Sequence, residues 1–386
     1  MKTLKIGLLP KILIAIALGI GAGLIAPEWF ARIFVTFNGI FSQFLGFVIP
    51  LIIVALVTTA IADIGNKAGK MLLITVAIAY GSTVFAGLVS YLTGATLFPS
   101  MIESGAGMES VNEAQSLSPY FGVNIPPLMG VMTALILAFT VGLGLASTQH
   151  DTLMKATHGF EEIMVKTIKT AIIPLLPLYI FGIFLDMAYV GKVFSVLGVF
   201  IKIIGVIFVI HIGILLLQFI IAGAVTKKNP FKLLYNMLPA YFTALGTQSS
   251  AATIPVTLEQ SRKNGVSEDI AGFTVPLCAT IHMAGSTLKI VACALALMIM
   301  MGMPYNFGLF AGFICMLGIT MVAAPGVPGG AIMASLGLLS SMLGFSAEAQ
   351  ALMIALYIAM DSFGTACNVT GDGAIALIVD RIFNKK

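Results

Sequence analysis

Charged side chains are scarce in this sequence of 386 residues. Asp, Glu, Lys and Arg make up 9% of it, whereas hydrophobic residues reach 59% and the mean hydropathy is +1.06. Soluble domains carry about 25% charged residues, so this composition excludes a soluble protein. The net charge of +4 comes from lysines in loops and gives no reason to expect a nucleic-acid partner. We therefore expect a polytopic protein of the lipid bilayer, with room for roughly eight to ten membrane segments of about 20 residues.

Cysteine and arginine are also rare. The cysteines show no metal-ligand spacing and lie in apolar segments, so we expect them to pack as small hydrophobes without forming disulfides. They are Cys278, Cys293, Cys315 and Cys367. Nothing signals a catalytic nucleophile, and we expect neither an enzyme nor a cofactor other than a coupling ion. The arginines are Arg32, Arg262 and Arg381.

The most informative polar residues form a stripe near the C-terminus. A helix of about 100° per residue places four of them at i, i+4, i+7 and i+11, on one face roughly 60° wide. They are Asp361, Thr365, Asn368 and Asp372. A charge at bilayer depth costs roughly 3 kcal/mol even on lenient scales. The stripe must therefore face a polar cavity, a bound cation or another polar element, which predicts a substrate or ion site.

Runs of apolar residues predict an all-α fold with eight transmembrane helices. Their approximate ranges are 8–26, 34–62, 70–97, 126–147, 163–190, 193–225, 269–302 and 348–383. Two further apolar stretches, 236–266 and 305–346, are interrupted by Ser, Gly and Pro, and we expect them to form re-entrant helical hairpins. The lysine clusters of the loops then fall on one side of the membrane, which predicts that both termini are cytoplasmic.

The seventh span contains a polar interruption, Thr280-Ile281-His282-Met283-Ala284-Gly285-Ser286. The eighth span has a similar outline at 366–372, and each interruption follows a hairpin rich in Gly, Pro and Ser. Two half-sites, each a hairpin with a broken helix, predict an inverted structural repeat with the substrate near the bilayer midplane. The free N–H and C=O groups of the half-helix ends are suited to holding an ion.

Five segments carry a resemblance to a known family. They are Ser-Ser-Ala-Ala-Thr-Ile-Pro-Val-Thr (249–257), Gly-Val-Ser-Glu (265–268), Pro-Leu-Cys-Ala-Thr-Ile-His-Met-Ala-Gly (276–285), Gly-Val-Pro-Gly (326–329) and Asn-Val-Thr-Gly-Asp (368–372). In this order they resemble the dicarboxylate/amino acid:cation symporter family, the glutamate transporter homologues. The resemblance implies a homotrimer in which a transport domain moves like an elevator against a scaffold. Residues 1–232 would be mainly scaffold, apart from the third and sixth spans, and 233–386 would be the transport core.

The resemblance also implies roles for individual residues. Asp361 would bind the α-amino group of the substrate, and Asn368 its α-carboxylate. The expected substrate-binding residues are Ser249, Ser250, Ser286, Val327, Gly329, Asp361, Gly364, Thr365 and Asn368. The expected cation-coupling residues are Ser82, Thr83, Cys278, Thr280, His282, Lys289, Asn368 and Asp372. Of these, Asp372 and Asn368 would be the ligands of Na+, if it is bound.

Three positions depart from the family pattern and bear on the substrate. Gly364 stands where carriers of glutamate and aspartate have an arginine, and His282 and Ala284 replace an asparagine and an aspartate. Because arginine is the preferred partner of a side-chain carboxylate, we expect a small neutral amino acid such as serine, alanine or threonine. Its side chain would meet Ser286, Ser362, Thr365 and Cys367. The alternative is an acidic amino acid or a C4-dicarboxylate, bound by Lys289 or by protonated His282.

The coupling ion stays open at this point. Ala284 removes one carboxylate from the family's sodium sites, so we expect a reduced dependence on sodium. Lys289 either takes the place of a sodium ion, paired with Asp372, or extends its apolar stem to a membrane interface. His282 either carries a coupling proton or is neutral and bonded to backbone carbonyls. Coupling to Na+ and coupling to H+ are both compatible with this pattern.

A channel is a further alternative, but it would need a continuous polar file, whereas the polar residues here gather in one C-terminal cluster. We therefore expect a secondary active transporter that spans a bacterial-type cell membrane several times.

Overall fold

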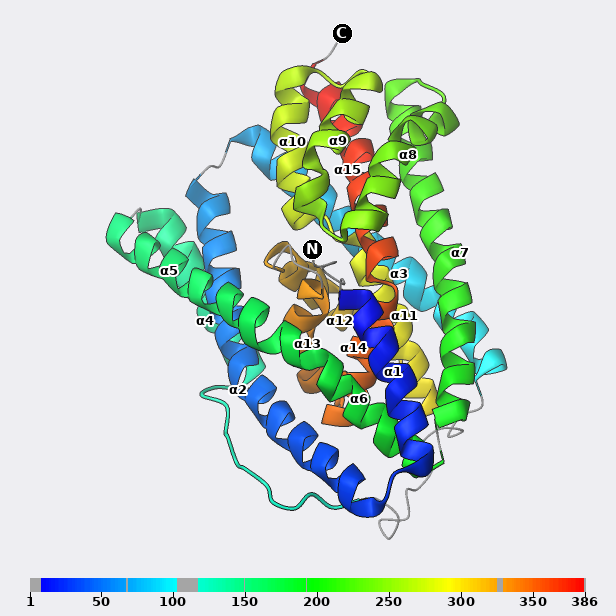
Figure 1. Ribbon diagram of the computed structural model, residues 1–386. Coiled ribbons are helices and arrows are strands. Elements are labelled where there is room, and N and C mark those ends of the chain that lie inside the picture. Colours follow the sequence, from blue (N-terminus) through cyan, green and yellow to red (C-terminus); the bar gives the residue numbers. More distant parts are fainter. Residues whose placement is uncertain are drawn as a thin grey trace, which may run out of the picture.

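The computed structural model describes residues 8–66, 69–102, 117–148, 150–191, 193–324 and 329–384, and this part of the chain forms helices and no strands. Figure 1 shows an elongated bundle, with α8, α9 and α10 at the end where the C-terminus lies. The first half contributes α1 (Leu8–Ile25), α2 (Glu28–Asn66), α3 (Lys70–Met101), α4 (Val131–Thr148), α5 (Asp151–Thr167), the π-helical turn η1 (Ile168–Ile172), α6 (Ile173–Tyr189) and α7 (Val193–Thr226). The second half contributes α8 (Pro230–Thr247), α9 (Ser250–Lys263), α10 (Glu268–Ile281), α11 (Ala284–Met300), α12 (Phe307–Val322), α13 (Gly330–Leu343), α14 (Ala347–Ala359) and α15 (Asp361–Phe383).

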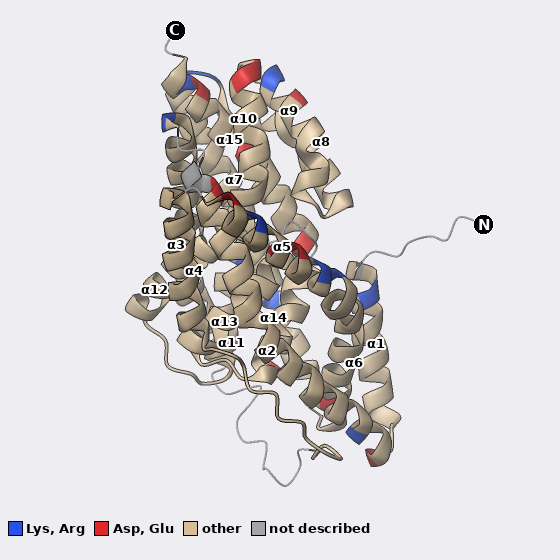
Figure 2. Cartoon of the chain, turned by 90° about the vertical axis from the view of Figure 1, so that its left-hand side faces the viewer, with Lys and Arg blue, Asp and Glu red and all other residues tan. Residues whose placement is uncertain are grey.

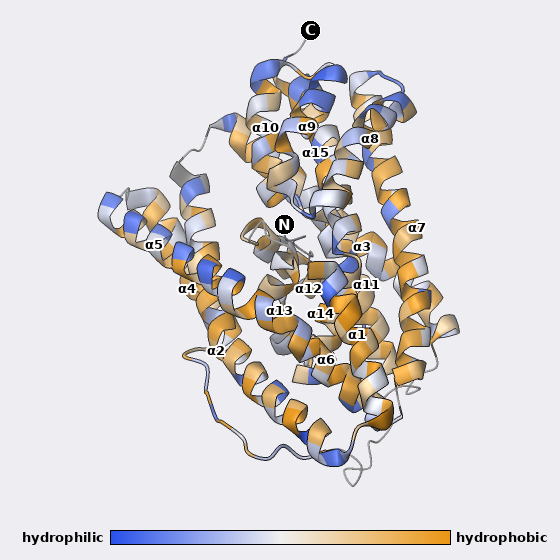
Figure 3. Ribbon diagram, viewed as in Figure 1, coloured by the Kyte–Doolittle hydropathy of each residue, from blue (hydrophilic) through white to orange (hydrophobic). Residues whose placement is uncertain are grey.

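Six helical segments of the described chain are long and apolar enough to cross a membrane, and the bent pair α14–α15 would make a seventh. Large apolar side chains on these helices face outward, for example Ile136 on α4 and Val209 on α7, which are 65% and 71% exposed. Figure 3 shows apolar residues along the long helices and hydrophilic ones at many of their ends, and Figure 2 shows the charged residues mostly at helix ends and along α5. An apolar outer surface of this extent needs lipid around it. The prediction of an all-helical, multi-pass membrane protein is confirmed.

The structure shifts some of the predicted boundaries. The span expected at 163–190 is part of a longer helical segment that begins at Asp151 and contains η1. The two stretches expected as hairpins form helix pairs, α8 with α9 and α12 with α13, whose members pack on each other. Gln248, between α8 and α9, takes a left-handed conformation with φ +53° that turns the chain.

Two helices of the C-terminal half are interrupted. The first interruption separates α10 from α11 at His282 and Met283. It lies within residues 280–286, where an interruption was predicted, so this prediction is confirmed. The second separates α14 from α15 at Met360, where the two helix axes bend by 62°. The prediction of an interruption at 366–372 is wrong, because these residues lie inside the continuous helix α15.

Helices α1 and α6 approach each other closely through two glycines. A Cβ atom on Gly19 would lie 2.6 Å from the carbonyl oxygen of Phe181, and one on Gly23 would overlap the carbonyl oxygen of Leu185. Small residues four apart allow the backbones of membrane helices to meet. Gly21, between them, has no atom within 4 Å of the corresponding position.

We expect Gly23→Val to lower the thermal stability of the detergent-purified protein, because overpacking a close contact costs about 1–3 kcal/mol. Gly21→Val is the matched control, since it adds the same side chain to the same helix in open space. The two unfolding temperatures, measured side by side, check this. Equal effects of the two substitutions would contradict the close α1–α6 contact.

Candidate functional site

Asp361 links the second hairpin to the bend between α14 and α15. It is the first residue of α15, and its side chain is buried. Oδ2 accepts a hydrogen bond from the backbone N–H of Gly329 (2.8 Å), just before α13. Gly329 has φ +75°, a conformation that glycine adopts without steric cost. Thr365, one turn further on, donates its hydroxyl to the carbonyl oxygen of Asp361 (3.0 Å).

Asn368 binds the start of α11 at the other interruption. Its Oδ1 accepts from the backbone N–H groups of Gly285 (2.8 Å) and Ser286 (3.3 Å). Its Nδ2 donates to the hydroxyl of Ser286 (3.1 Å) and to the sulfur of Met283 (3.3 Å). The hydroxyl of Ser286 also accepts a hydrogen bond from Tyr357 of α14 (3.0 Å). The amide thus satisfies backbone donors that a helix start leaves free, and it joins α15 to α11.

Lys289 of α11 is the cation that faces Asp361. Its side chain is 1% exposed, and Nζ lies 3.7 Å from Oδ1 of Asp361. Nζ also donates to the carbonyl oxygen of Met360 (3.1 Å) and stands 3.9 Å from the ring centroid of Tyr357. The prediction that Lys289 pairs with Asp372 is therefore wrong. The alternative, in which Lys289 reaches out to an interface, is wrong as well, because its side chain is enclosed by protein.

Gly364 provides the space that Lys289 occupies. A Cβ atom at Gly364 would overlap Nζ and Cε of Lys289. The family resemblance implies an arginine at position 364 in carriers of acidic amino acids. In this chain the ammonium group of Lys289, from the neighbouring helix α11, lies over Gly364 instead. Gly364 and Lys289 depend on one another sterically.

His282, in the interruption between α10 and α11, is the partner of Asp372. Its Nδ1 lies 2.9 Å from Oδ1 of Asp372, and both side chains are almost completely buried. A carboxylate is an acceptor, so Nδ1 is the donor of this bond. On the other side of the ring, Nε2 lies 3.1 Å from the hydroxyl oxygen of Ser82 on α3. The two hydrogen bonds replace the predicted contacts of His282 with backbone carbonyls.

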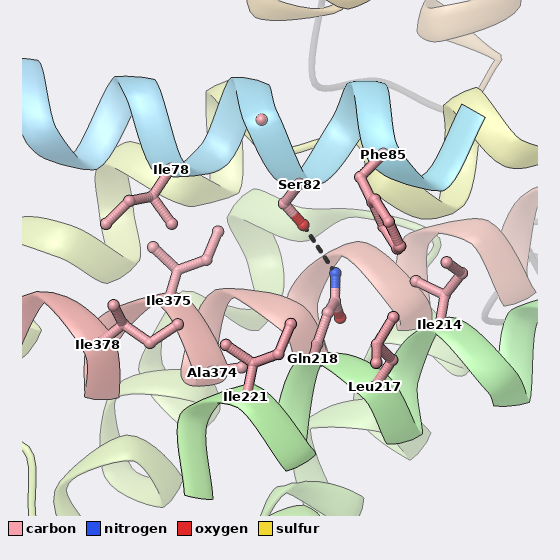
Figure 4. A pocket seen from close by; sticks show the side chains of 11 residues that line it. Ile78, Ser82, Phe85, Ile214, Leu217, Gln218, Ile221, Ala374, Ile375 and Ile378 are labelled. Carbon is pink, nitrogen blue, oxygen red and sulfur yellow. Dashed lines mark hydrogen bonds between the residues drawn. The ribbon is translucent and has the colours of Figure 1, made fainter. Parts of the chain in front are cut away.

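Gln218 of α7 belongs to this cluster, although the sequence analysis missed it. Its Nε2 donates to the hydroxyl of Ser82 (3.0 Å) and lies 3.5 Å from Nε2 of His282. Figure 4 shows Gln218 and Ser82 facing each other in a cavity lined otherwise by apolar side chains of α3, α7 and α15, with a volume of about 250 Å³. The sequence did contain a signal for Gln218: it is an amide inside a long apolar helix, and polar side chains are rare within membrane segments.

The remaining candidate residues lie in different places. Ser249 caps α9 by accepting from the backbone N–H of Ala252 (3.3 Å), and Ser250 is the buried first residue of that helix. Among the described residues, no hydrogen bond joins either serine to Asp361 or Asn368. Thr83 accepts the backbone N–H of Met283 (3.2 Å).

Two further candidates, Cys278 and Thr280, contribute no side chain to this cluster. Cys278 is buried in α10, and its carbonyl oxygen accepts the N–H of His282 (2.8 Å). Thr280 is exposed and bonds to the carbonyl oxygen of Leu277 in its own helix (2.7 Å). Val327 lies outside the described residues.

The arginines Arg32 and Arg262 are engaged away from this site. Arg32 donates to the carbonyl oxygen of Ser118 (3.0 Å), and Arg262 forms an exposed ion pair with Glu268 (3.0 Å).

A sequence model of the sodium:dicarboxylate symporter family matches residues 8–382 of this chain. The chain belongs to this family. It is also similar to two serine/threonine transporters named SstT from Acinetobacter baumannii. One is 26% identical over 401 residues, and the other, from strain AYE, is 27% identical over 404 residues; in both cases the match covers 97% of each chain. The family resemblance expected from the sequence is confirmed, and the family consists of transporters rather than enzymes.

We expect the stability changes of Gly364→Ala and Lys289→Met to be coupled. Each substitution alone disrupts the contact between Lys289 and Asp361, so the double variant should lose less stability than the sum of the two, by about 0.5–3 kcal/mol. Gly272→Ala in α10 is the control, because no atom lies within 4 Å of the new Cβ. Its change in stability measures the effect of replacing glycine by alanine in a helix without any steric contact. Unfolding of the four proteins in detergent checks this, and strictly additive changes would contradict the packing of Lys289 over Gly364.

Proposed function

We propose that this protein is a secondary active transporter that carries a small neutral amino acid, such as serine or threonine, across the membrane. The observation that supports this most directly is the convergence of Asp361, Asn368 and the second hairpin at two helix interruptions. Asp361 suits an α-ammonium group, and the amide of Asn368 suits an α-carboxylate. The relatives named serine/threonine transporters match the chain over almost its whole length.

The electrostatics of the site favour a neutral substrate side chain. Lys289 is the nearest described cation to Asp361, and it is already shared among Asp361, the carbonyl of Met360 and the ring of Tyr357. A second carboxylate on the substrate would have to take Lys289 from these partners. An acidic amino acid or a C4-dicarboxylate remains the competing substrate class.

The packing of the helices supports an elevator architecture with eight spans and two re-entrant hairpins. Helix α1 packs on α6, and α2 packs on α4, which is the grouping expected of a scaffold. Helices α3 and α7 instead pack on α11 and α15, together with the hairpin α8–α9. This grouping agrees with the proposal that the third and sixth spans belong to the transport domain. We also propose a homotrimer with both termini in the cytoplasm, from the family resemblance and the lysine distribution.

We expect purified protein in proteoliposomes to take up labelled serine in a saturable manner, with competition by threonine and alanine. Asp361→Asn should reduce this uptake roughly tenfold or more, because it removes the charge-assisted bond to the substrate ammonium group. Thr96→Ala is the control, since Thr96 is exposed on α3 and bonds to its own helix. Saturable uptake of aspartate or succinate that serine does not inhibit would reject the neutral substrate. Single-channel current steps far larger than the uptake rate would indicate a channel.

A further inference from the structure

The oxygen atoms expected to hold a coupling cation are bonded to the protein itself. Oδ1 of Asp372 accepts from His282 (2.9 Å). Oδ1 of Asn368 accepts two backbone N–H groups, which uses both of its lone pairs. The hydroxyl of Thr83 accepts the N–H of Met283, and the hydroxyl of Ser82 lies between His282 and Gln218. Each of these oxygens is turned toward a donor.

These residues do not fit a sodium ion. A hard cation needs several oxygen ligands that point at one position. Among the side-chain oxygens of this cluster, Oδ2 of Asp372 and Oε1 of Gln218 have no hydrogen-bond partner, and two free oxygens are fewer than a hard cation needs. The imidazole ring of His282 stands on the side where Oδ1 of Asp372 would face an ion.

We propose that His282 is a built-in substitute for a sodium ion at Asp372, so that the protein binds and transports its substrate without Na+. The proposal rests on the proposed transport function and specifies its coupling at this site. The N–H of the imidazole supplies the donor that the buried carboxylate needs.

The geometry of α15 supports this assignment. A Cβ atom at Gly371 would lie 2.6 Å from Cε1 of His282 and 2.7 Å from Oε1 of Gln218. Gly371 therefore makes room for His282 as Gly364 does for Lys289. The two glycines are seven residues apart, on one face of the helix. The same face thus accommodates two internal partners, one for each buried carboxylate of α15.

In the competing explanation, the contact between His282 and Asp372 is purely structural and sodium binds elsewhere in the protein. Measurements on the wild-type protein in sodium and in choline distinguish this explanation from our proposal. Its thermal stability should be the same in sodium chloride and in choline chloride of equal concentration, because a ligand stabilises only the state that binds it. Serine uptake into proteoliposomes should also be unchanged when choline replaces sodium on both sides of the membrane. A sodium-specific rise of several degrees in unfolding temperature, or a loss of uptake in choline, would overturn the proposal.

His282→Ala supplies the positive test. Removing the ring leaves Asp372 without its donor and opens space beside it, so sodium should now stabilise the variant by several degrees relative to choline. His282→Ala combined with Asp372→Asn is the matched control, because it keeps the space but removes the carboxylate, and it should show no sodium effect. Equal behaviour of the single and double variants would count against the substitution of an ion by the ring.

The two proposals fail in different ways. The ion comparison of unfolding temperatures needs no substrate, so it tests the role of His282 even if serine is not transported. If His282→Ala does not fold, the wild-type comparison alone still decides. Conversely, a sodium-independent protein that takes up no neutral amino acid would overturn the proposed substrate and leave the role of His282 standing.

Discussion

A carboxylate buried among hydrocarbon side chains needs a partner, and the C-terminal half of this molecule depends on that constraint. Removing one member of such a pair costs about 3–5 kcal/mol, because the remaining charge stays buried. Asp361 and Asp372 both lie on α15, and their partners Lys289 and His282 both come from the segment that contains α10 and α11. The two ends of the polar stripe are therefore tied to one neighbouring segment. Any movement of α15 relative to α11 would separate buried polar groups from the partners that satisfy them.

The helix interruptions obey the same constraint, because their free backbone groups are also buried and also need partners. An interrupted helix leaves backbone N–H and C=O groups free inside the protein, where each must find a partner. Asn368 accepts the N–H groups at the start of α11, and Lys289 donates to the carbonyl of Met360 at the end of α14. Side chains of each interrupted segment thus complete the backbone of the other. The interruptions and the polar stripe form one connected structure, in which Asn368 joins α15 to the start of α11 and Asp361 joins it to the second hairpin.

Local patterns in the sequence were sufficient for the all-helical, multi-pass class and for the polar stripe. Asp361, Thr365, Asn368 and Asp372 do lie on one continuous helix, because the period of 3.6 residues is a local property. The partner of Lys289 could not be predicted in this way. Whether it faces Asp361 or Asp372 depends on the relative height of α11 and α15, and no local pattern encodes the register between two helices.

The two interruptions differ in how visible they are to sequence reasoning. The one near His282 contains Gly285 and several polar residues, and it was predicted at the correct place. The one at Met360 has an ordinary apolar residue at the bend, and its stabilising contacts come from Lys289 and Gly329, distant in sequence. The similarity between 280–286 and 366–372 suggested a break where the helix is continuous. Asn368 and Asp372 serve instead as hydrogen-bond partners of the first interruption.

Gly364 and Lys289 are best understood as one change. An arginine at position 364, as the resemblance implies for carriers of acidic amino acids, would begin with a Cβ atom that overlaps the lysine. A chain with Lys289 in this place therefore needs glycine at 364. The positive charge has in effect moved from α15 to α11, and there it faces Asp361 and the carbonyl of Met360 rather than open space. A cation engaged in this way balances the charge of the site but offers little to a second carboxylate. We therefore expect Lys289 to balance the charge of Asp361 rather than to bind a carboxylate of the substrate side chain.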